Sequence, residues 1–95
     1  MPYIPQEDRQ SLEHQLQELT VRLATNPEEF AGRMNYALSA LINGIIKERG
    51  VSYTVINDII GVLESVKLEL YRRVAIPYED SKIKENGDVY NQKAP

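Results

Sequence analysis

The chain has 95 residues, of which 42% are hydrophobic and 26% charged, and its 11 basic and 14 acidic side chains give a formal net charge of −3. This size and composition predict one small globular domain rather than a disordered chain. The acidic balance argues against binding along extended nucleic acid, which needs a basic face. Because the chain has no cysteine, disulfides and thiolate chemistry are excluded.

The termini and the hydropathy pattern predict a cytoplasmic protein. The first residues lack the basic segment and apolar run of a signal peptide, and no apolar stretch approaches the roughly 18–20 residues that cross a bilayer. A domain of this size buries only a thin core, so homo-oligomerisation is expected as a source of further burial.

The first helix is predicted over residues 6–25. Its leucines follow a narrow stripe with steps of four, three and four residues, which resembles a coiled-coil seam: Leu12, Leu16, Leu19 and Leu23. His14 lies off this stripe without a visible partner, so no catalytic role is assigned to it.

The second helix is predicted over residues 27–49, starting at a capping signal. Asn26 caps, Pro27 takes the first helical position and Glu29 completes a capping box. Its apolar face is broad enough for burial on two sides. Gly50 is a natural C-terminal cap.

The third helix is predicted over residues 53–76, with Ser52 or Thr54 as its cap. It is expected to end before Pro77, because the residue preceding a proline disfavours helical backbone. Helix-interior glycines such as Gly61 indicate close helix crossings, or alternatively room for a ligand. Residues 77–95 are predicted to form a tail, with a turn at residues 86–87. The expected architecture is all-α: a three-helix antiparallel bundle with the C-terminal tail packed across it.

Lys67 is the most unusual residue of the third helix, because its helical angle places it among apolar neighbours. Two interpretations stay open. Lys67 pairs with Glu64, three residues earlier, at the edge of the core. Alternatively, it forms the wall of a polar pocket and holds an anion.

The second interpretation gains weight from tyrosines and cations that follow Lys67, since cations pair with phosphate and tyrosine rings stack on bases. In this hypothesis Lys67 and Arg73 hold phosphate, while Tyr71 and Tyr78 cap the base. The residues assigned to hydrogen bonds with the ligand are Asn35, Asn57 and Glu64.

An enzymatic role is not favoured. Helical nucleotide pyrophosphohydrolases hold magnesium with E-E-x-x-E and E-x-x-D segments, but Glu28-Glu29 is followed by Gly32, and Glu64 by Lys67. No metal site and no cofactor is predicted.

Several short segments together resemble an uncharacterised family of small helical proteins from phages and bacteria. The resemblance covers nearly the whole chain and rests on residues 1–4, 35–37, 53, 56–57, 61, 63–64, 67, 71–73, 77–80 and 85–90. It implies a phage or phage-derived setting, hence a host cytoplasm, where small oligomeric proteins counter host defence.

The sequence therefore leads to one preferred function and one alternative. The preferred function is non-enzymatic binding of a small phosphorylated nucleotide, as in a phage counter-defence protein that sequesters a nucleotide signal. The alternative is a structural or protein-binding helical module. A magnesium-dependent pyrophosphohydrolase ranks below both.

Overall fold

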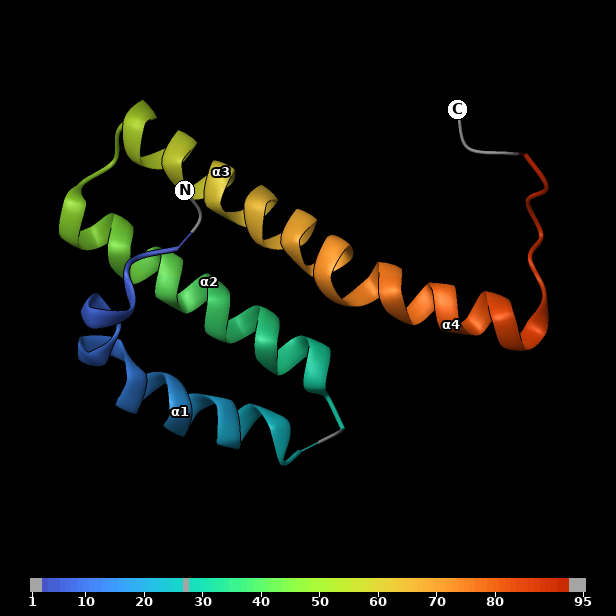
Figure 1. Ribbon diagram of the computed structural model, residues 1–95. Coiled ribbons are helices and arrows are strands. Elements are labelled where there is room, and N and C mark those ends of the chain that lie inside the picture. The colour runs from blue at the N-terminus through green and yellow to red at the C-terminus, as the bar shows by residue number, and fades with distance from the viewer. Residues whose placement is uncertain (1–2, 27, 93–95) are drawn as a thin grey trace. The chain divides into compact units, whose positions relative to one another are not determined.

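The computed structural model describes residues 3–26 and 28–92, and every element assigned in them is helical (Figure 1). The elements are the 3₁₀ turn η1 (Gln6–Asp8), α1 (Gln10–Ala24), α2 (Phe30–Arg49), α3 (Tyr53–Leu70), the π-helical turn η2 (Tyr71–Ala75) and α4 (Ile76–Asn86). The predicted all-α class is confirmed for these residues.

The chain divides into two compact units, Met1–Ile59 and Ile60–Pro95, and each is described by itself. In the first unit, α1 and α2 contact each other and run side by side in opposite directions (Figure 1). The antiparallel three-helix bundle, the tail packed across it and the single-domain organisation stay predictions.

Helix α1 is shorter than the predicted range of 6–25. Residues 6–8 form a tighter 3₁₀ turn, and regular α-helix begins only at Gln10. A hydrogen bond spans this turn: Nε of Arg9, which follows it, donates to the carbonyl of Ile4, 3.1 Å away.

The predicted start of α2 at residue 27 is wrong, because the helix begins at Phe30. Glu29 precedes it with φ 61° and ψ 18°, a left-handed conformation that breaks helical backbone on its N-terminal side. The Glu29 side chain makes no capping hydrogen bond, so the capping box is absent. Pro27, placed at the first helical position, lies outside the described residues.

The link between α2 and α3 follows the predicted signals. Gly50 ends α2 with φ 85°, and its N–H donates to the carbonyl of Ile46 at 2.7 Å. Ser52 then caps α3, because its Oγ accepts the N–H of Val55 at 3.2 Å. Of the two candidate caps, the structure therefore selects Ser52 over Thr54.

The sequence predicts that helical backbone ends before Pro77. In the structure it continues to Asn86. The continuation depends on the π turn η2, where the N–H of Ile76 donates to the carbonyl of Tyr71, five residues back. Pro77 is the second residue of α4; it has no N–H to donate, and the wider π turn before it leaves room for its ring. Gly87, with φ 87°, ends α4, so Asn86, which the sequence placed in a turn, is the last residue of the helix.

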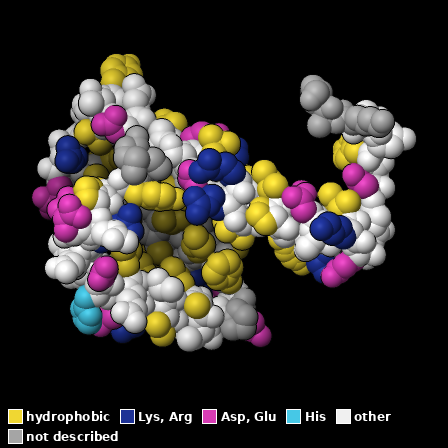
Figure 2. Space-filling model, viewed as in Figure 1, with side chains coloured by type: hydrophobic (Ala, Val, Ile, Leu, Met, Phe, Trp, Pro, Cys, Tyr) yellow, Lys and Arg dark blue, Asp and Glu magenta, His cyan; other side chains and the backbone are white. Residues whose placement is uncertain are grey.

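None of the described residues is buried. Hydrophobic side chains, yellow in Figure 2, lie open on the face in view. The helix-interior glycines also face open space, since a Cβ added to Gly32, Gly44 or Gly61 would meet no atom within 4 Å. Within each unit, therefore, no helix among the described residues crosses closely at these glycines. Among the helices of the described residues, none combines the length and apolar character needed to cross a membrane.

Candidate functional site

Lys67 is exposed and paired rather than enclosed. Its Nζ lies 3.7 Å from Oε1 of Glu64, one turn earlier in α3, and the two side chains are 62% and 57% exposed. Of the two interpretations open from the sequence, this geometry matches the ion pair. An exposed pair of this kind contributes well under about 1 kcal/mol to stability.

The aromatic and basic residues assigned to the ligand lie in the second unit, on η2 and at the start of α4. Tyr71 and Arg73 belong to the π turn, and Tyr78 to the first turn of α4; all three are exposed. The Tyr78 ring already has a cation, because Nζ of Lys82 lies 5.5 Å from its centroid.

The neighbouring arginine of the π turn, Arg72, is paired as well. Its Nη2 donates to both carboxylate oxygens of Glu69, at 2.9 and 3.2 Å. Glu69 is one of the few half-buried residues in the structure. This contact ties the π turn to the preceding turn of α3.

The two asparagines assigned to the ligand lie in the first unit. Asn35 on α2 is exposed, and its Oδ1 accepts a hydrogen bond from Oγ of Ser39 at 3.2 Å. Asn57 on α3 is also exposed. Of the seven predicted site residues, the structure therefore brings one pair into contact, Glu64 and Lys67.

A feature that the sequence analysis missed is a heptad pattern in α3. Ile60, Leu63, Lys67 and Leu70 follow steps of three, four and three residues, the spacing of a coiled-coil seam. We call these four residues the α3 seam. Its apolar members are 59%, 42% and 57% exposed in chain order. When residues are spaced at 100° each, these four positions fall within a wider apolar face of the helix. A repeat of 3.5 residues per turn would have separated them from that face as a heptad pattern.

A groove of about 950 Å³ lies in the first unit between α1 and α2. Its walls are largely apolar, and charged groups lie among its lining residues, which are Leu19, Arg22, Leu23, Glu29, Gly32, Arg33, Tyr36, Ala37, Ala40 and Leu41. The groove exists partly because Gly32, Ala37 and Ala40 present little side chain. The small residues of α2 were the sequence signal that could have predicted it.

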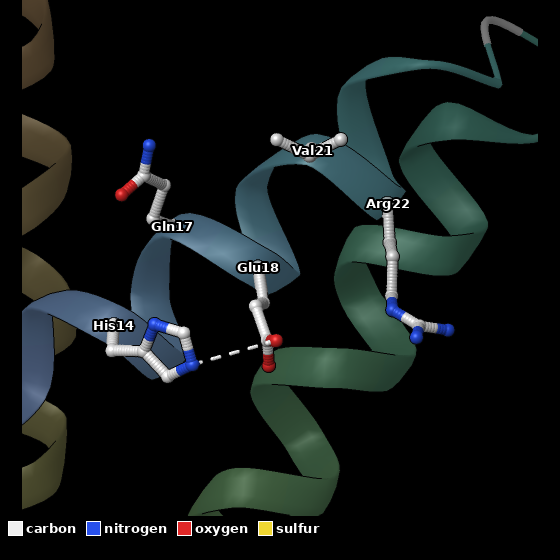
Figure 3. Close-up of a pocket in the computed structure, with 5 residues that line it drawn as sticks. All are labelled: His14, Gln17, Glu18, Val21 and Arg22. Atoms are coloured by element: carbon white, nitrogen blue, oxygen red, sulfur yellow. Dashed lines mark ion pairs between the residues drawn. The ribbon is translucent and has the colours of Figure 1, made fainter.

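A second, shallower hollow lies on α1 alone, with the side chains of Gln17, Val21 and Arg22 around it (Figure 3). There Nε2 of His14 lies 3.5 Å from Oε1 of Glu18, a contact that is ionic only when the imidazole is protonated. Both side chains are largely exposed. This pair is a helical neighbour contact between residues four apart, and it provides no substrate-binding enclosure.

In the part of the chain that the structure describes, no group of three or more His, Cys, Asp or Glu side chains lies close enough together to hold a metal ion.

The chain matches the model of a protein family. Residues 1–89 match the model of a domain of unknown function, DUF6899. The chain belongs to the DUF6899 family. No curated protein and no solved structure matches it. The resemblance to an uncharacterised family is thereby confirmed, while the phage or bacterial setting of this DUF6899 chain stays an expectation.

Proposed function

We propose that this chain is a helical association module whose exposed apolar faces are covered by other protein chains. The carrying observation is that no described residue is buried, while the α3 seam presents three large aliphatic side chains to solvent. Exposed large aliphatic side chains gathered along one helix are typical of an association site. This favours the second of the two functions that the sequence left open.

Energetic considerations support the same conclusion. A helical domain gains most of its stability from packing an amphipathic face, because isolated helices are marginal in water. Below about 70–80 residues a single core supplies few kcal/mol, and the present chain is only slightly longer. Association with another chain would supply the missing burial.

Light scattering coupled to gel filtration tests the proposal. The full chain should elute with a mass above the monomer's 10.9 kDa, and the mass should fall on dilution. Leu70→Asp should lower the mass, whereas Val89→Asp should not, because Val89 lies outside every helix and is 91% exposed. A monomer at all concentrations that also co-purifies with no protein would contradict the proposal.

Nucleotide binding remains a second candidate on one observation. Tyr71 and Arg73 lie on a π turn, and such turns occur often at functional sites. The supporting geometry is weaker than for association, since Lys67 is exposed and already paired with Glu64. Calorimetry against cyclic and linear nucleotides tests it, and absence of heat at high protein concentration would exclude it.

A further inference from the structure

We propose that two copies of the chain pair antiparallel through the α3 seam, with Lys67 of each copy beside Glu64 of the other. This inference rests on the proposed association function and names both the partner and the contact. Its occupant is a second copy of this chain.

The seam is self-complementary about residue 65. In an antiparallel pair centred there, Ile60 lies opposite Leu70 of the second copy, and Leu63 opposite Lys67. Each of the four seam positions of one helix therefore meets a seam position of the other, which is the condition for a closed twofold interface.

Charge complementarity accompanies this apolar register. Glu64 occupies the position beside the seam, next to the layer that Lys67 of the second copy enters. The twofold axis repeats the contact, so the pair has two Glu64–Lys67 contacts between copies. Within one chain, Nζ of Lys67 and Oε1 of Glu64 lie 3.7 Å apart, so both head groups reach the same side of the helix.

The antiparallel pairing also gives Lys67, an unfavourable residue in an apolar seam, a structural role. A single lysine in a heptad seam lowers stability but selects orientation and oligomeric state. A parallel pair would place the two Lys67 side chains opposite each other, where like charges repel. The antiparallel pair separates them and gives each a carboxylate.

Charge reversal tests the contact. Glu64→Lys should weaken self-association roughly tenfold, because two attractions per pair become repulsions, and Glu64→Lys/Lys67→Glu should restore it. The matched control is Glu85→Lys, which breaks the exposed Lys82–Glu85 pair of α4, at 3.1 Å, without touching the seam. Circular dichroism on every variant checks that helicity is retained. Equal association of Glu64→Lys and the control would overturn the pairing.

Cross-linking tests the orientation, using the absence of native cysteine. Ile60→Cys and Leu70→Cys chains of different length are mixed and treated with a short bismaleimide. The antiparallel pair predicts products between the two variants, and few between identical chains. Products between identical chains would indicate a parallel pair and overturn the inference while leaving association intact. A monomeric wild-type chain would remove both.

Discussion

The N–H of Ile76 donates its hydrogen bond to the carbonyl of Tyr71, five residues earlier, instead of to Arg72 four residues earlier. The cause lies one residue further on. Pro77 has no N–H, and its ring crowds the carbonyl four residues before it, that of Arg73. Widening the helix by one residue relieves this crowding and lets helical backbone continue through the proline.

Pro77→Ala should therefore convert the π turn to regular α-helix. The alanine supplies the missing N–H, and the expected gain is about 1 kcal/mol, below the roughly 3 kcal/mol cost of a proline in a regular helix, because the π turn already relieves the crowding by the ring. Urea unfolding followed by circular dichroism measures the gain. Pro5→Ala is the control, since Pro5 precedes η1 outside the helices. Equal effects of both substitutions would argue against Pro77 as the cause.

Ser52→Ala should destabilise the fold by about 1 kcal/mol, because it removes the acceptor of the Val55 N–H at the start of α3. Thr54→Ala is the matched control: Thr54 lies inside the first turn of α3, where alanine is a better helix former. Thermal unfolding of both variants makes the comparison. A larger loss of stability for Thr54→Ala than for Ser52→Ala would mean that Ser52 is not the cap of α3.

Glycines at two positions should respond in opposite directions. Gly61→Ala should stabilise α3 by about 1 kcal/mol, since an added Cβ meets no atom within 4 Å. Gly50→Ala should destabilise by about 1 kcal/mol or more, because φ 85° is strained for any side chain. The midpoints of denaturant unfolding of the two variants and of the unsubstituted chain measure both effects. Destabilisation by Gly61→Ala would mean that another helix crosses closely there.

Local signals in the sequence predicted some helix ends and missed others. Gly50 was identified as a cap and the start of α3 was narrowed to Ser52 or Thr54, because each of these signals is a single residue that satisfies adjacent backbone groups. The start of α2 was not predicted, since a left-handed Glu29 has no sequence signature. The path through Pro77 was missed because π turns have no residue pattern of their own.

Lys67 shows why the candidate site was only partly predictable. Helical angle correctly located the lysine among apolar positions and identified Glu64 as its neighbour. The angle could not say whether those apolar positions would be covered, because burial depends on what packs against a helix. In the structure they lie exposed, so a charge there needs no ligand.

Replacing Lys67 with leucine separates the two candidate functions. In the association module, Lys67→Leu completes the apolar seam, so self-association should strengthen by about a hundredfold, because the pair buries two further aliphatic side chains, one from each copy. In the nucleotide binder, the same change removes a phosphate-holding cation, and nucleotide binding should be lost without a gain in association. Sedimentation and calorimetry on one preparation measure both. Lys82→Leu is the control, because Lys82 is an exposed, paired lysine outside the seam. If Lys67→Leu changes neither quantity more than the control does, Lys67 belongs to neither function.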